Sequence, residues 1–177
     1  MGKGSPRPKK ARMSRSKIKV LLIVFFDWKS TVYHEFVPHG QMVNKQLYQE
    51  VLSRLRDAVH RKRPGLWENQ TWMLHHDNAP AHASLLIRSY LVKHQTSVVS
   101  HPPYYPDLAP ADIFLFPELK ITLKRCRFQT IEEIQVNAIR ELHATTDGAF
   151  QEAFQQWKKR CERCFGSGGD YFEGDSA

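Results

Sequence analysis

Apolar and polar positions follow two rhythms along the chain, one typical of strands and one typical of helices. A continuous apolar run from Val20 to Phe26, ending at Asp27, predicts a strand buried on both faces. After a short polar break at 28–30, the β-branched and aromatic run 31–37 predicts a second strand. Together the two runs predict a β-hairpin.

The helical rhythm begins after the hairpin. Asn44 is a suitable N-cap for a helix, and the basic cluster 61–63 suits its C-terminal end. Pro64 and Gly65 are expected to stop it. An apolar stripe recurs between these limits at helical spacing, formed by Leu47, Tyr48, Val51, Leu52, Leu55 and Val59.

Two short strands are expected in the middle of the chain, at residues 71–76 and 97–100. A turn at 77–82 separates the first of them from a helix that runs to about His94. The side chains of that helix expected to face inward are Leu85, Leu86 and Tyr90.

Three more helices are expected in the C-terminal part. A loop stiffened by four prolines, at 101–110, leads into the first, and Thr130 with Glu133 forms a capping-box signature for the second. The third, over about 148–164, carries an aromatic stripe that is typical of a core face rather than of a base-stacking surface. The order of the elements predicts an α/β fold with a mixed sheet flanked by helices.

The composition supports one globular domain without a membrane span. The 177 residues are 41% hydrophobic and 11% aromatic, and the longest apolar run, seven residues, is far below the roughly 20 that a bilayer requires. Net charge is +8, and eight lysines and arginines but no acid lie in the first 19 residues. The sequence therefore predicts a basic arm at 1–18 and a folded domain at 19–177.

A basic arm of this kind has affinity for polyanions, and some such arms act as nuclear import signals. We therefore expect weak, nonspecific binding of double-stranded DNA and a nuclear location. The arm residues expected to contact DNA are Lys9, Lys10, Arg12 and Arg15.

Two acids are candidates for metal chemistry. Asp77 follows a predicted strand, at the end where α/β sheets place ligands, and Asp112 lies in the first turn of a predicted helix. Carboxylates so placed can share a divalent cation such as Mg²⁺. The alternative is purely structural: Asp77 caps the next helix, and Asp112 favours a helix dipole.

The spacing of these acids and the words around them favour the chemical interpretation. Thirty-four residues separate Asp77 from Asp112, within His-Asp-Asn-Ala-Pro-Ala-His at 76–82 and Tyr-Tyr-Pro-Asp-Leu-Ala-Pro-Ala-Asp at 104–112. This pattern resembles that of mariner transposases, of the mariner/Tc1 superfamily. The resemblance extends to the basic arm, to Arg63-Pro64 and to the tail at 167–172. Tyr105 departs from it, because the family usually has Ser there.

The resemblance implies an RNase H-like catalytic domain that cuts transposon ends and joins them to target DNA with Mg²⁺ or Mn²⁺. It implies catalytic, metal-binding roles for Asp77 and Asp112, which match the second and third of three family aspartates. The Gly-Asp-Glu-x-Trp word of the first is absent from this sequence. Asp27 is a weaker substitute, since its setting matches the strand after the catalytic one. Tyr104 and Tyr105, beside Asp112, are further candidates for DNA contact.

The same comparison implies a partial RNase H-like fold and a 5′-truncated transposase, because the first catalytic strand and the preceding helix-turn-helix region are not matched. Without that strand, the hairpin and the strand before Asp77 must pair directly, borrow a strand or expose hydrophobic edges. We expect a transposase fragment that is inactive alone and that pairs with itself or with a full-length relative. The alternative is a non-catalytic module for DNA binding or protein interaction.

Two other groups are weaker metal candidates. Cys161 and Cys164 lie on a predicted helix without a second ligand pair, so a zinc site is not favoured. Strand alternation places His75 and His76 on opposite faces, which argues against joint metal ligation. His82 is expected to orient Asp77.

Overall fold

The structure, a computed structural model, describes residues 19–102 and 108–166. Along the chain the elements are β1 (Leu21–Phe26), β2 (Thr31–Val37), α1 (Lys45–Lys62), α2 (Pro64–Glu68), β3 (Met73–His75), α3 (Leu85–Lys93), β4 (Ser97–Val99), the π-helix η2 (Ala111–Leu115), α4 (Phe116–Lys124), α5 (Ile131–Ala144) and α6 (Asp147–Gly166). The predicted basic arm at 1–18 lies outside the described residues.

The first two strands form the predicted hairpin. β1 pairs with β2 in antiparallel register from Leu21 opposite Val37 to Phe26 opposite Thr31, with a bulge between Phe25 and Phe26. The turn begins at Asp27, whose amide donates to the carbonyl of Ser30.

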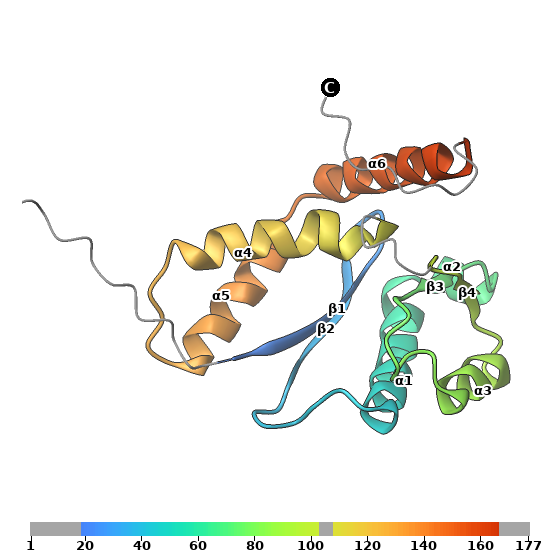
Figure 1. The fold of residues 1–177 in the computed structure, drawn as a ribbon, viewed down its shortest axis with the longest axis horizontal. Coiled ribbons are helices and arrows are strands. Elements are labelled where there is room, and N and C mark those ends of the chain that lie inside the picture. Colours follow the sequence, from blue (N-terminus) through green and yellow to red (C-terminus); the bar gives the residue numbers. More distant parts are fainter. Residues whose placement is uncertain (1–18, 103–107, 167–177) are drawn as a thin grey trace, which may run out of the picture.

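The hairpin lies between two layers of helices. Phe25 packs against the core cluster built around α1, whereas Leu22, Val24 and Phe26 pack against the cluster formed by η2 and α4–α6. Side chains of β1 thus pack on both faces, but none of them is fully buried, so the prediction of a strand buried on both faces needs correction. Figure 1 shows α1 on one side of the hairpin and α4 and α5 on the other, with α6 lying across one end.

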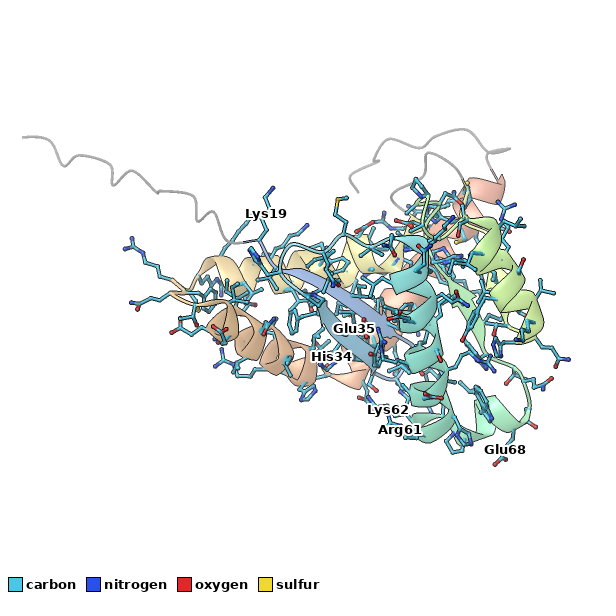
Figure 2. The ribbon with its side chains drawn as sticks, turned by 90° about the horizontal axis from the view of Figure 1, so that it is seen from below. Lys19, His34, Glu35, Arg61, Lys62 and Glu68 are labelled. Carbon is cyan, nitrogen blue, oxygen red and sulfur yellow. The ribbon has the colours of Figure 1, made fainter. Side chains whose placement is uncertain are left out.

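α1 is the central helix of the first layer. Asn44 caps it by accepting a hydrogen bond from the amide of Leu47 (2.8 Å), and three basic residues occupy its last turn. Arg54 bridges to Glu35 of β2 with two hydrogen bonds of 2.8 and 2.9 Å. Figure 2 shows Glu35 and His34 on the strand that runs beside α1. The predicted apolar stripe is confirmed for Tyr48, Val51, Leu52, Leu55 and Val59, which are buried, whereas Leu47 is only partly buried.

The strands form two sheets rather than the single mixed sheet that the sequence predicts. β3 pairs with β4 in parallel, and within residues 19–102 and 108–166 no ladder joins this pair to the hairpin. Helix packing holds them together instead, because Val32 of β2 and Leu74 of β3 share one core cluster with α1. Every residue of β1 stays partly exposed, so the hairpin keeps an accessible edge rather than pairing directly with β3.

Three local predictions need correction. Pro64 does stop α1 but also opens α2, because proline fits the first position of a helix. Leu85, expected inside, is 79% exposed, and Ile87 and Leu91 are the buried residues of α3. Pro110 precedes a π-helix, which turns into α4 at Phe116. In the described part of the chain, no helix has the length and apolar character of a membrane span.

Candidate functional site

Asp77 follows β3 directly and presents one free carboxylate oxygen. Its Oδ1 accepts hydrogen bonds from the amide of Ala79 (3.0 Å) and from Nδ1 of His82 (2.6 Å). Its Oδ2 has no hydrogen bond to any residue that the structure describes, and 58% of the side chain is exposed. Burial tends to raise the pKa of Asp77, but the Ala79 amide and His82 outweigh it and keep that pKa below its usual value. Asp77 is therefore an ionised carboxylate with one oxygen available.

Asp77 does not cap the following helix. Ser84 is the N-cap of α3, since its hydroxyl accepts from the amide of Ile87. The alternative that Asp77 serves as the helix cap is therefore wrong. The hydrogen bonds of the Asp77 carboxylate are made within the turn at 77–82. His82 holds its carboxylate, as the sequence predicts.

The two histidines that precede Asp77 point to opposite faces, as strand alternation predicts. His75 lies beside His101 and Trp157, with ring centroids 5.3 Å from each. His76 lies beside Tyr48, whose hydroxyl is 3.0 Å from His76 Nδ1. Burial lowers the pKa of His76 to about 4, so this ring is neutral at physiological pH.

Asp112 lies in the first turn of η2 and is exposed. Its amide donates to the carbonyl of Ala109 (3.0 Å), and its carboxylate makes no hydrogen bond or ion pair with another described residue. Its carboxylate is therefore available to a cation, as that of Asp77 is.

Two points of the chain between these acids, His101 and Leu108, are fastened next to β3. His101 Nδ1 lies 3.3 Å from His75 Nε2, and the carbonyl of His101 accepts from the side chain of Asn78 (2.8 Å). At the other end, Trp157 Nε1 donates to the carbonyl of Leu108 (2.8 Å) while its ring packs on His75. Leu108 and His75 thus contact the same indole. Leu108 lies four residues before Asp112, and His75 lies two residues before Asp77.

Sequence reasoning missed this junction. Trp157 belongs to the aromatic stripe of 148–164, which the sequence pattern assigns only to a core face, and the pattern gives His101 no role. The indole N–H was the available signal, because a buried Trp usually finds an acceptor for it. Which acceptor it finds is decided by packing between elements far apart in sequence.

Both carboxylate oxygens of Asp27 accept hydrogen bonds within the hairpin turn and from Arg63. Its Oδ1 accepts from the amides of Lys29 and Ser30, both at 2.9 Å, and Arg63 donates to both oxygens at 2.6 and 3.1 Å. Burial favours a raised pKa for Asp27, but these donors together lower it. Both oxygens are occupied, so Asp27 closes the hairpin turn onto the end of α1.

The remaining candidates do not add ligands within the described residues. Cys161 and Cys164 lie on α6 and form no disulfide within the described residues, and no group of three or more potential ligands gathers anywhere in 19–102 and 108–166. Phe150 is fully buried in the core, as the stripe predicts. The predicted DNA contacts Lys9, Lys10, Arg12, Arg15, Tyr104 and Tyr105 lie outside the described residues.

The donor set around Asp77 fits a hard divalent cation. An open pocket of about 550 Å³ borders Asp77 and is lined by polar side chains, including Asn78, His82 and Arg88, and by apolar side chains of α3 and β4. Carboxylate oxygens are the ligands that Mg²⁺ and Mn²⁺ prefer, and Mg²⁺ usually keeps water and substrate phosphates as further ligands. Asp77 and Asp112 each have a carboxylate oxygen that no other described residue occupies.

Comparison with known proteins gives the family. The family described as transposase (partial DDE domain) matches residues 1–69. The mariner Mos1 transposase of Drosophila mauritiana is 33% identical over 171 residues, which make up 96% of this chain and 50% of that protein. The human histone-lysine N-methyltransferase SETMAR is 24% identical over 156 residues, 88% of this chain and 23% of that protein. The chain thus spans half or less of these relatives.

Solved structures agree with the sequence comparison. The Mos1 transposase catalytic domain, solved with raltegravir and Mn, has a TM-score of 0.79 and 32% identity over 87% of this chain and 78% of that one. A pre-cleavage Mos1 transpososome has a TM-score of 0.86 and 32% identity over 98% of this chain and 51% of that one. With this identity, coverage and fold, the chain belongs to the mariner transposases and has their RNase H-like α/β architecture.

Proposed function

We propose that this chain is a catalytic portion of a mariner-type DNA transposase, which acts on transposon-end DNA with Mg²⁺ or Mn²⁺ held between Asp77 and Asp112. Solved structures of Mos1 support the metal and the DNA in this proposal. They include the catalytic domain with Mn, the catalytic domain with Mg, and a paired-end complex with the left transposon end. The chain's own residues support the site.

The observation that carries this proposal is the shared contact of His75 and Leu108 with the indole of Trp157. That contact draws the start of η2, and with it Asp112, toward the end of β3, where Asp77 has an unengaged oxygen. Neither acid forms an ion pair with an arginine or lysine among the described residues. Such an arrangement favours a cation as the missing counter-charge.

When bound, divalent cations stabilise both the attacking and the leaving oxygen of a phosphodiester. Asp77 and Asp112 would hold the cation, and His82 would keep Asp77 in a fixed orientation. The family uses a third carboxylate from a Gly-Asp-Glu-x-Trp word, which this sequence does not contain. Losing one ligand costs several kcal/mol of transition-state stabilisation. We therefore propose that the 177-residue chain binds the cation but does not cut DNA by itself.

The first prediction concerns cation binding and DNA cleavage by the 177-residue chain. Purified chain incubated with a labelled mariner-type transposon-end duplex and Mg²⁺ or Mn²⁺ should give no nicked product on a denaturing gel. In a parallel titration followed by electron paramagnetic resonance, Mn²⁺ should bind, and Asp77→Asn and Asp112→Asn should each weaken binding about 10-fold or more.

Robust cleavage that disappears in Asp77→Ala would contradict the predicted inactivity and would require another third ligand. Mn²⁺ binding that is indifferent to both Asn variants would instead exclude the cation site and would favour the alternative, a non-catalytic DNA-binding or protein-interaction module.

We further propose a nuclear location and two kinds of macromolecular partner. Double-stranded DNA is expected to bind weakly and without sequence preference, through a basic arm at 1–18 that precedes a catalytic domain at 19–177. A second copy of the chain, or a full-length transposase, is the expected protein partner. The paired-end complexes of Mos1 support DNA and a second transposase copy as the kinds of partner.

A further inference from the structure

Behind the free oxygen of Asp77 lie three aromatic rings in mutual contact. The ring centroids of Tyr48 and His82 are 3.9 Å apart, those of His76 and His82 are 5.3 Å apart, and those of Tyr48 and His76 are 5.9 Å apart. The two imidazoles are nearly parallel, at 6°. Since only His82 bonds to Asp77, the other two rings reach the carboxylate through it.

Tyr48 is the immobile member of this cluster. It lies in the first turn of α1, is 2% exposed, and belongs to the core cluster that includes Leu52 and Leu74. Burial, with the nearby charge of Asp77, raises the pKa of the Tyr48 phenol, so its hydroxyl stays protonated at physiological pH. That hydroxyl shares a hydrogen bond with His76 Nδ1. Core packing therefore fixes both the ring and its polar end.

His82 transmits this rigidity to the carboxylate. An ionised carboxylate only accepts hydrogen bonds, so His82 Nδ1 carries the hydrogen that it donates to Asp77 Oδ1. The Ala79 amide donates to the same oxygen. Two donors on one oxygen fix the carboxylate plane and leave the second oxygen facing outward. The Tyr48 ring, tilted by 32° against the His82 ring with centroids 3.9 Å apart, limits where the His82 ring can lie.

We propose that Tyr48 is a positioning residue for Asp77: its buried ring holds His82 in the orientation that directs the free Asp77 oxygen toward a divalent cation. The cation rests on the function proposed above, whereas the ring geometry does not. In this arrangement α1 sets the orientation of Asp77, although α1 itself contributes no metal ligand to the site.

The simpler interpretation is that Tyr48 only fills the core. The two roles predict different responses from variants that separate the aromatic ring from the hydroxyl. Tyr48→Phe keeps the ring against His82 and removes the hydrogen bond to His76. Tyr48→Leu removes the ring. Leu52→Ala is the matched control, because Leu52 is equally buried one turn further along the same face of α1 and has no aromatic ring to pack on His82.

The experiment measures Mn²⁺ affinity and, without metal, the position of the His82 ring hydrogen by long-range ¹H–¹⁵N correlation spectroscopy. Tyr48→Phe should retain the Mn²⁺ affinity and the Nδ1-bound hydrogen of His82. Tyr48→Leu should lose about 10-fold in affinity, matching His82→Ala, and its His82 hydrogen should exchange between the two nitrogens. Leu52→Ala should lower stability and change neither readout.

Unchanged affinity and an unchanged His82 signal in folded Tyr48→Leu would overturn the proposal, as would equal losses in Leu52→Ala. Asp77→Asn separates this failure from failure of the proposed function. If Asp77→Asn leaves Mn²⁺ binding intact, the cation site is wrong, and the metal-free His82 signal still decides whether Tyr48 positions the ring.

Discussion

At the residue scale, the chain uses the same residue type after two strands for different purposes. Asp27 follows β1 and has both oxygens occupied by two backbone amides and Arg63. Asp77 follows β3 and has one oxygen occupied and one free. Both acids have a lowered pKa, so their ionisation does not distinguish the structural acid from the candidate ligand. The distinction lies in the second carboxylate oxygen, which is occupied in Asp27 and free in Asp77.

The second prediction concerns the Asp27–Arg63 pair. Their side chains are 20% and 15% exposed, so Arg63→Ala leaves a half-buried carboxylate without its main partner. The free energy of unfolding should fall by about 1–3 kcal/mol in urea titrations. Arg54→Ala, at an ion pair whose arginine is 44% exposed, is the control and should cost less than about 1 kcal/mol.

The same pair gives a pH dependence with a defined sign. Because the folded-state pKa of Asp27 is lowered, its contribution is present above the unfolded value and is lost as pH falls through the folded one. The stability difference between wild type and Arg63→Ala should therefore be full at pH 7 and shrink below about pH 4. A difference that stays constant down to the acid transition would show that the pair contributes through packing alone.

At the element scale, α3 illustrates how tertiary packing selects a helix face. The sequence correctly predicts a helix after the turn at 77–82, but Leu85, expected inside, is 79% exposed, while Ile87 is fully buried. A nine-residue helix with many apolar side chains has no single obvious face, and contact with α1 decides which one is covered.

The third prediction compares these two residues of α3. Ile87→Ala should lower the free energy of unfolding by about 2–5 kcal/mol, because it leaves a cavity in the core. Leu85→Ala should change it by less than about 0.5 kcal/mol. Thermal or urea unfolding followed by circular dichroism measures both, and similar losses in the two variants would place Leu85 in an interface.

At the scale of the whole molecule, two helices join the separate sheets from opposite sides. α1 packs on Val32 and Leu74, while the aromatic series Phe26, Phe154, Trp157 and His75 runs along α6, with ring centroids between 5.3 and 6.0 Å apart.

Charge is distributed unevenly over the same molecule. The first 19 residues carry eight basic residues, and the remainder is neutral, with 18 basic and 18 acidic residues.

The fourth prediction follows from this charge distribution. Affinity for duplex DNA should come mainly from counterion release by the basic segment, with Kd on the order of 10⁻⁴ to 10⁻⁶ M at physiological salt and little sequence preference. Deletion of residues 1–18 should abolish most binding in fluorescence anisotropy titrations and flatten the dependence of log K on log salt. An unchanged isotherm would move the DNA-contacting surface to the region of Tyr104 and Asp112.

The sequence by itself determined the features that depend on neighbours along the chain. Strand alternation and turn chemistry defined the hairpin and the opposite orientations of His75 and His76. Asn44 and Thr130 marked the starts of α1 and α5, since a cap bonds to an amide three residues away. The words around Asp77 and Asp112 identified the family and the candidate ligands.

Tertiary structure alone decided how these local pieces meet. The bond between Tyr48 and His76 spans 28 residues, and that between Trp157 and Leu108 spans 49. Separate sheets, the exposed face of α3 and the rings behind Asp77 arise from such contacts. No periodicity specifies them, because each depends on which buried surfaces fit together once the helices pack, whereas caps and strand alternation depend only on backbone geometry within a few residues.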